Sequence, residues 1–161
     1  MTELFDAFRA LMMLSAANAT PILVARLAQG RFATPLDFGC TLADGERLLG
    51  SHKTWRGFLS GVAACAAVGM LFGVSLKVGA AFGCVSLLGD ALSSAVKRRL
   101  HAKPGTEYVG LDQIGEALLP LILFAKLLSL NLADVLAVAF AFTVLDLATE
   151  RIRHRGLNNR R

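Results

Sequence analysis

Apolar residues gather in five blocks along this chain, and the blocks are separated either by short polar breaks or by two long polar loops. The blocks cover approximately residues 4–28, 58–76, 78–95, 114–130 and 133–148. Several approach the ~20 residues that a helix needs to cross the hydrocarbon core of a bilayer, and the last three are short or interrupted. The pattern predicts an all-α integral membrane protein built as a bundle of about five transmembrane helices.

The two short breaks determine how the predicted helices are grouped. They fall at Lys77 and at Asn131-Leu132, and such tight turns favour antiparallel neighbours within one bundle. We therefore expect a single transmembrane domain over residues 1–161. The two long loops, approximately residues 29–57 and 99–113, exceed the usual connection length and are candidates for function.

Composition and charge agree with a membrane location and suggest its orientation. Hydrophobic residues make up 55% of the 161 residues and charged residues 18%, which is more apolar than an ordinary soluble domain. Of the 17 Lys and Arg residues, all but Arg9, Lys77 and Lys126 fall in the two long loops, at their edges or near the C-terminus. The positive-inside rule then predicts two cytoplasmic loops, a cytoplasmic C-terminus and an N-terminus outside, in a multi-pass protein of the cell (inner) membrane. A basic cytoplasmic face suits anionic lipids and nucleotides, so the net charge of +5 needs no nucleic acid to explain it.

One carboxylate stands inside an apolar block. Helical spacing places Ser86, Asp90, Ser94 and Lys97 on one stripe, and the helix is expected to end in Lys97-Arg98-Arg99. A charge at membrane depth is costly, so the stripe predicts a site for a metal ion and a phosphate chain. The alternative is a buried ion pair between Asp90 and a basic residue of another helix.

The first loop combines glycine with basic residues. Three glycines between residues 44 and 57 would let backbone amides approach a phosphate, and Arg47, Lys53 and Arg56 would supply positive charge. The alternative is a basic loop that only sets the membrane topology. Trp55 suits an interfacial anchor in either case.

The second loop ends at another carboxylate, Asp112. A turn at Pro104-Gly105 would let the loop fold back, so that Asp112 could approach Asp90. Two carboxylates, with water and phosphate oxygens in the remaining positions, are a common arrangement around Mg²⁺. The equally weighted alternative is that Asp112 caps the N-terminus of the fourth helix.

Polar residues near the two ends of the chain have milder interpretations. Asn18 and Pro21 lie in the first block, where they indicate a cross-helix hydrogen bond and a kink, whether structural or functional. Asp146 and Glu150 are four residues apart near Arg153, which is typical of a helix-end ion pair.

Four motifs in this order resemble the CDP-archaeol synthase family, which is related to the phosphatidate cytidylyltransferases. They are residues 18–21 (NATP), residues 44–50 (DGERLLG) with 53–57 (KTWRG), residues 89–99 (GDALSSAVKRR), and Asp112-Gln113. The resemblance extends from about residue 18 to residue 113, and the last two blocks contribute little to it.

The resemblance implies a membrane enzyme of five spans that joins CTP to a lipid phosphate, with Mg²⁺, and yields a CDP-lipid and pyrophosphate. The implied catalytic residues are Asp90, Lys97 and Asp112, of which Asp90 and Asp112 would hold the metal ion. The residues implied to bind the triphosphate, the nucleotide or the lipid headgroup are Arg98, Asp44, Arg47, Lys53, Thr54 and Arg56, and Asn18 would line the cavity. The lipid phosphate oxygen would attack the α-phosphorus of CTP directly, without a covalent enzyme intermediate.

Two other functions stay open at this point. A CTP-dependent lipid kinase would transfer the γ-phosphoryl group and release CDP. A small non-enzymatic membrane protein, for example a transporter subunit, would use Asp90 as a proton or cation relay. The expected partners are CTP and an archaetidic or phosphatidic acid type of lipid phosphate, with a homodimer left open.

Overall fold

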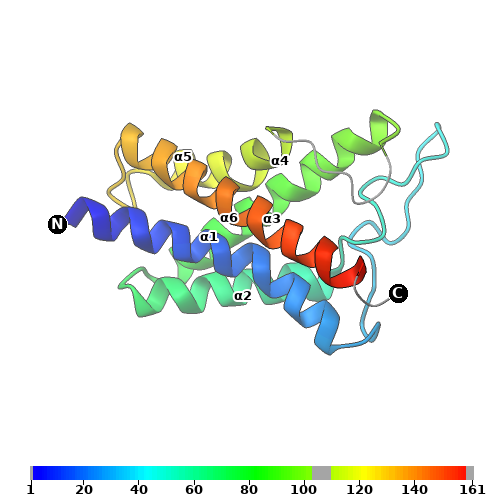
Figure 1. The fold of residues 1–161 in the computed structure, drawn as a ribbon, viewed down its shortest axis with the longest axis horizontal. Helices are drawn as coiled ribbons and strands as arrows, with labels where there is room; N and C mark the ends of the chain where they lie inside the picture. The colour runs from blue at the N-terminus through cyan, green and yellow to red at the C-terminus, as the bar shows by residue number, and fades with distance from the viewer. Residues whose placement is uncertain (1, 103–109, 159–161) are drawn as a thin grey trace.

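The structure is a computed structural model that describes residues 2–102 and 110–158. Its helices run along a common long axis (Figure 1). In chain order they are α1 (Thr2–Leu27), α2 (Trp55–Leu71), α3 (Leu76–Arg99), α4 (Leu111–Gln113), the π-helix η1 (Ile114–Leu118), α5 (Leu119–Phe124) and α6 (Leu132–Asn158). Apart from the helices, the described residues form only two isolated β-bridges, both in the first loop. The predicted all-helical class is confirmed.

Local sequence explains where several helices begin. Thr54 precedes α2 in an extended conformation, and its hydroxyl accepts a hydrogen bond from the Gly57 N–H at 3.3 Å. Ser75 caps α3 in the same way through the Val78 N–H. Before α6, Asn131 and Asp134 each accept a hydrogen bond from the other's backbone N–H, at 2.9 and 3.0 Å. These caps satisfy N–H groups that a helix cannot pair internally.

Within the described residues, three helices are long and apolar enough to cross a membrane, namely Glu3–Leu27, Leu76–Arg99 and Leu132–Thr149. Helix α2 is apolar and has 17 residues, at the lower limit for a span. The fourth predicted block departs from expectation, because its helical segment is broken into three elements, starts at Leu111 and ends at Phe124. The turn predicted at Lys77 lies slightly earlier, since α3 already includes that residue.

The long connections and the short ones lie at opposite ends of the bundle. In Figure 1 the N-terminus, the α2–α3 turn and the α5–α6 turn lie at one end, and the first loop, the end of α3 and the end of α6 lie at the other. This arrangement agrees with an odd number of passes. The predicted turn at Pro104-Gly105 lies outside the described residues.

Glycine allows two pairs of helical segments to approach very closely. A Cβ atom built on Gly61 of α2 would lie 2.5 Å from the Ala17 carbonyl oxygen of α1. A Cβ on Gly89 of α3 would lie 1.8 Å from the carbonyl oxygen of Gly115 in η1. The second crossing brings the backbone of α3 into contact with the π-helix, and it thereby places Asp90 beside the residues that follow Asp112.

Apolar side chains form both the core of the bundle and much of its outer surface. Large apolar side chains such as Leu71 (82% exposed) and Phe140 (72%) face outward, as expected for helices surrounded by lipid. Apart from Asp37 in the first loop, the buried polar and charged residues of the described chain lie on α3 and on the segment from α4 to η1; they are Ser86, Ser93, Ser94, Lys97, Arg98, Asp112, Gln113 and Glu116. Buried polar groups within a membrane bundle indicate a functional interior.

Candidate active site

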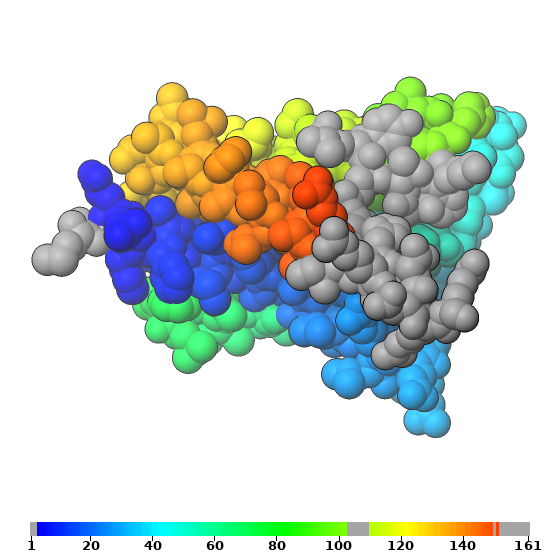
Figure 2. Space-filling model, viewed as in Figure 1, coloured from blue at the N-terminus to red at the C-terminus, as the bar shows by residue number. Residues whose placement is uncertain are grey.

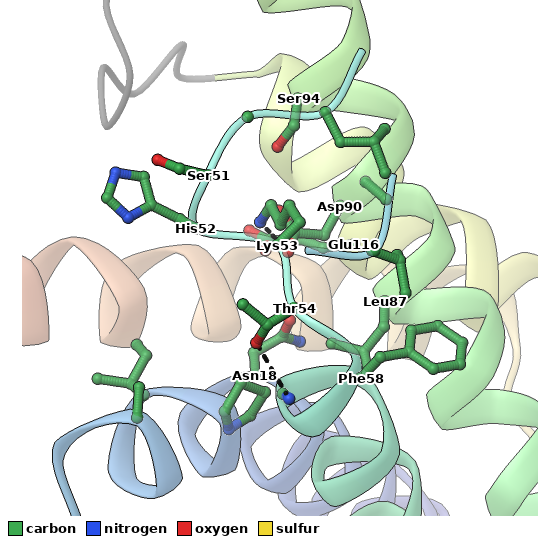
Figure 3. Close-up of a pocket in the computed structure, with 18 of the residues that line it drawn as sticks. Asn18, Ser51, His52, Lys53, Thr54, Phe58, Leu87, Asp90, Ser94 and Glu116 are labelled. Carbon is green, nitrogen blue, oxygen red and sulfur yellow. Dashed lines mark hydrogen bonds and ion pairs between the residues drawn. The ribbon is translucent and has the colours of Figure 1, made fainter. Parts of the chain in front are cut away.

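A cavity of about 700 Å³ opens at the end of the bundle that carries the first loop. Its wall is formed by α1, the first loop, α2, α3, the α4–η1 segment and α6 (Figure 3). Its charged lining consists of the cations Arg26, Lys53, Arg56, Lys97 and Arg98 and the carboxylates Asp90, Asp112, Glu116 and Asp146. Opposite charges are therefore interleaved in one space, which suits an anionic ligand that arrives with a cation.

Asp90 forms an ion pair with Lys53. The Lys53 ammonium group donates to Oδ2 of Asp90, and the side chains are only 26% and 21% exposed, respectively. Figure 3 shows this pair between the first loop and α3, beside Glu116. The ion-pair alternative for Asp90 is therefore observed, although the partner comes from the loop and not from another span. Because the pair lies in the wall of the cavity, it does not exclude the predicted ligand site.

Asp112 forms a second ion pair, with Lys97. The Nζ atom of Lys97 lies 2.8 Å from Oδ1 and 3.0 Å from Oδ2 of Asp112, and both side chains are 11% exposed. The alternative that Asp112 is an N-cap is wrong, because Gly110 occupies that position with φ +101°. Gly110 donates its N–H to the side chain of Gln113 at 2.6 Å. The Asp112 carboxylate is thus left to face α3 and the cavity.

Glu116 is the site residue that sequence reasoning missed. It is 7% exposed, lines the cavity, and its Oε1 atom has no hydrogen-bond partner among the described residues. Two signals in the sequence could have identified it. Glu116 follows Asp112 by four residues, which places both on one helical face, and it lies in an apolar block where a carboxylate is as costly as Asp90 is.

Asp146 also lies in the cavity wall, whereas the sequence favoured a helix-end ion pair. The side chains of Arg153, the basic residue expected nearby, and of Glu150, the second acid on that face, lie outside the described part of the chain. Asp146 therefore adds to the site a carboxylate from α6 that was not among the predicted site residues.

Asn18 and the polar stripe of α3 connect the cavity to the core. The Asn18 amide donates to the Leu14 carbonyl oxygen at 3.0 Å and to the Ser86 hydroxyl at 3.2 Å. The Ser86 hydroxyl donates in turn to the Glu116 carbonyl oxygen at 2.6 Å. Asn18, Asp90, Ser94 and Lys97 line the cavity, but Ser86 is fully buried and holds α1, α3 and η1 together.

Two predicted site residues do not line the cavity and instead form ion pairs that involve the first loop. Asp44 accepts two hydrogen bonds from Arg99, at 2.9 and 2.7 Å, and Arg47 lies 3.5 Å from Asp37. The other predicted site residues line the cavity: Asn18, Lys53, Thr54, Arg56, Asp90, Lys97, Arg98 and Asp112. Arg56 also donates to the Arg31 carbonyl oxygen. The roles assigned to these residues by resemblance stay predictions.

Asp37 fixes the fold of the first loop. Its carboxylate accepts hydrogen bonds from the Gly39 N–H at 2.9 Å and the Leu49 N–H at 3.0 Å. Burial alone would raise the pKa of Asp37, but the hydrogen bonds from Leu49 and Gly39 and the nearby Arg47 guanidinium together lower it below its ordinary value. The ionised carboxylate therefore stabilises the folded loop.

This lowered pKa gives a pH-dependent prediction for Asp37→Asn. The stabilisation is fully present above the unfolded pKa of about 3.9 and is lost as the pH falls through the lower folded pKa. We expect the wild type to exceed the variant in thermal unfolding midpoint at pH 7, and the difference to disappear as the pH is lowered below about 3.9. Thermal unfolding in detergent across this range checks it. A difference that does not change with pH would contradict it.

No group of three or more His, Cys, Asp or Glu side chains in the described residues is arranged to hold a metal ion. The carboxylates of the cavity lie instead on separate elements, with Lys53 and Lys97 bound to two of them.

Comparison with known proteins gives consistent results. A family model described as CarS-like, CDP-archaeol synthase, matches residues 4–81. The CDP-archaeol synthase of Thermofilum pendens is 38% identical over 132 residues, which cover 79% of this chain and 65% of that protein. The CDP-archaeol synthase of Pyrococcus furiosus is 34% identical over 125 residues, which cover 71% of each chain. The chain therefore spans about two thirds of the length of these relatives.

A solved structure supports the same relationship. An intramembrane enzyme for the biosynthesis of archaeal membrane lipids superposes with a TM-score of 0.76 at 32% sequence identity, covering 89% of this chain and 92% of the other. At this coverage the likeness extends beyond residues 18–113, the part of the chain that contains the sequence motifs. On the matched relatives, the shared fold and the motifs that surround the cavity, this chain belongs to the CDP-archaeol synthase family.

Proposed function

We propose that this membrane protein is a CTP-dependent cytidylyltransferase that converts a lipid phosphate of the archaetidic acid type to a CDP-activated lipid and pyrophosphate. The observation that carries the proposal is the cavity lining, which combines charged and apolar side chains. It includes Lys53, Lys97 and Arg98 among carboxylates, and apolar side chains such as Ile22 and Phe58. The charged side chains suit a nucleoside triphosphate, and the apolar side chains suit a lipid.

The proposed orientation places this cavity on the cytoplasmic side of the cell membrane, with the N-terminus outside. It follows from the basic residues of the two loops and of the C-terminal segment, and it gives the cavity access to cytoplasmic CTP. A homodimer stays a prediction, and the molecular mass of the protein within a detergent micelle would test it.

We propose Mg²⁺ as the cofactor, because the carboxylates of the cavity fit a hard cation. The available donors are oxygen atoms of Asp90, Asp112 and Glu116, which is the ligand type that Mg²⁺ prefers. The buried Oε1 atom of Glu116 has no hydrogen-bond partner in the described part of the chain, which supports an additional ligand at this place. Asp90 and Asp112 would hold the ion, with Glu116 facing it. When bound, the ion would neutralise charge on the triphosphate and on the leaving pyrophosphate.

The remaining catalysis is positioning and neutralisation by the protein. A lipid phosphate oxygen forms a bond to the α-phosphorus of CTP, the bond from that phosphorus to the bridging oxygen breaks, and pyrophosphate leaves with the electron pair. Lys53 and Lys97 each contact a carboxylate in the structure, so phosphate oxygens would compete for these ammonium groups when CTP binds. The buried Arg98 adds a further positive charge to the cavity lining. Charge-assisted contacts of this kind hold the reacting groups in line.

Doubly labelled CTP tests the reaction and separates it from the alternatives. Purified protein in detergent with Mg²⁺ and an archaeal ether lipid phosphate is expected to move the α-phosphorus label of CTP into the lipid and to release the γ-phosphorus label as pyrophosphate. Phosphatidic acid in a parallel reaction compares ester with ether tails.

Each other distribution of the label has a distinct meaning. If the γ-label entered the lipid and CDP were released, the protein would be a lipid kinase and the proposal would be wrong. If neither label moved and CTP failed to bind, the non-enzymatic alternative would replace it.

A further inference from the structure

The first loop exposes aromatic side chains at the end of the bundle. Phe32 is 82% exposed and Phe38 is 76% exposed, yet neither belongs to a membrane-spanning helix. The Trp55 ring at the start of α2 has its centroid 6.0 Å from that of Phe38 and 6.2 Å from that of Phe58. Aromatic rings at such a position are typical of a membrane–water interface.

The backbone holds the two phenylalanines outward. Phe32 has φ +55° and Phe38 has φ +49°, a left-handed conformation that bulky residues rarely adopt. For Phe38 the turn is fixed by its N–H bond to the Pro35 carbonyl oxygen at 3.1 Å and by the Asp37 bonds described above. The loop thus presents the ring in spite of an unfavourable conformation, and such strain points to a function for the exposed ring.

Positive charge adjoins these aromatic residues in the chain, since Arg31 precedes Phe32 and Arg56 follows Trp55. Arg26, at the end of α1, and Arg31 are both exposed, and the bond from Arg56 to the Arg31 carbonyl oxygen ties the loop to the first turn of α2. Figure 2 shows the segment after α1 as a light blue projection beyond the helices. Arginine beside exposed aromatic rings suits an anionic headgroup layer. The arginines can bind the lipid phosphates, and the rings can lie at the boundary with the apolar acyl chains.

We propose that Phe32, Phe38 and Trp55 seat the first loop in the anionic headgroup layer of the bilayer, at the doorway through which a lipid phosphate reaches the cavity. Trp55 contacts Phe58, which lines the cavity together with Pro21 and other apolar residues of α1. Contacts between aromatic rings therefore connect the exposed loop to the apolar side chains that line the cavity. The membrane contact stands by itself, whereas the role of doorway rests on the proposed lipid reaction.

Trp55 is the only tryptophan of the chain, so its fluorescence tests the membrane contact in the full protein without an assay of activity. The protein is placed in nanodiscs that contain anionic lipid with quenchers at the headgroup or deep in the acyl chains. We expect the headgroup quencher to reduce Trp55 emission several-fold more than the deep quencher or aqueous iodide does. The double variant Phe32→Ser/Phe38→Ser is expected to lose much of this preference and to become more accessible to iodide.

Leu42→Ser is the matched control, since Leu42 is also an exposed apolar residue of the loop, at 42%, but is not part of the aromatic group. In this variant each quencher should reduce Trp55 emission to the same extent as in the wild type. Iodide quenching of wild-type Trp55 as strong as that of free tryptophan would overturn the membrane contact. The doorway has a separate readout, which is a several-fold higher KM for the lipid phosphate in the double variant with the KM for CTP unchanged. An unchanged lipid KM in a variant whose Trp55 has left the interface would overturn the doorway alone.

Discussion

Asp90→Asn is expected to reduce cytidylyl transfer by about 10²- to 10³-fold, the loss typical of removing one preorganised charge from an active site. The substitution keeps the size of the side chain, so the packing of α3 is preserved. It removes the negative charge that faces Lys53 and that is proposed to hold Mg²⁺. Steady-state turnover and Mn²⁺ binding, followed by electron paramagnetic resonance, should both decline.

A second variant separates a ligand role from a purely structural one. If Asp90 served only to neutralise Lys53, the double variant Lys53→Met/Asp90→Asn would remove both charges and restore Mn²⁺ binding and folding. We expect it to restore thermal stability without restoring Mn²⁺ binding. Asp134→Asn is the matched control, because Asp134 is a partly buried acid at the start of α6 that does not line the cavity, and it should bind Mn²⁺ normally. Normal Mn²⁺ binding by Asp90→Asn would refute the metal assignment.

Gly89→Ala is expected to destabilise the fold by about 3 kcal/mol, near the upper end of what overpacking costs. The added methyl group would lie 1.8 Å from the Gly115 carbonyl oxygen, and backbone atoms on both sides of this crossing cannot rotate away. The α3 helix must therefore move from η1. Because Asp90 directly follows Gly89 in α3, it should move with the helix. We therefore also expect a higher Kd for CTP in the fraction of the variant that folds. Thermal unfolding and CTP titration in detergent measure the two effects.

Gly69→Ala provides the control on another helix. Its added methyl group would meet the flexible end of Met13, with Cε at 3.3 Å, and alanine favours a helix by roughly 1 kcal/mol over glycine. Stability should therefore be unchanged or slightly higher. If Gly89→Ala behaved like Gly69→Ala, the close crossing would not be what positions Asp90.

Hydrophobic blocks predicted most of the helices in this protein. In the structure Thr54, Ser75 and Asn131 cap helix starts, and each cap depends only on neighbours within a few residues. The fourth segment was the exception. Its π-helix packs against α3 through Gly115 and Gly89, which are far apart in the chain, and π-helical turns often lie at functional sites.

The sequence by itself determined the membrane class, the two polar loops and the candidate residues Asp90, Lys97 and Asp112, because hydropathy, charge placement and helical spacing are local properties. Only the tertiary structure decided that Lys53 of the loop faces Asp90 and that Glu116 and Asp146 join the cavity. It also showed that Asp44 lies outside that site and forms an ion pair with Arg99. These pairings join residues far apart in the chain, and they depend on how closely glycine lets the helices approach.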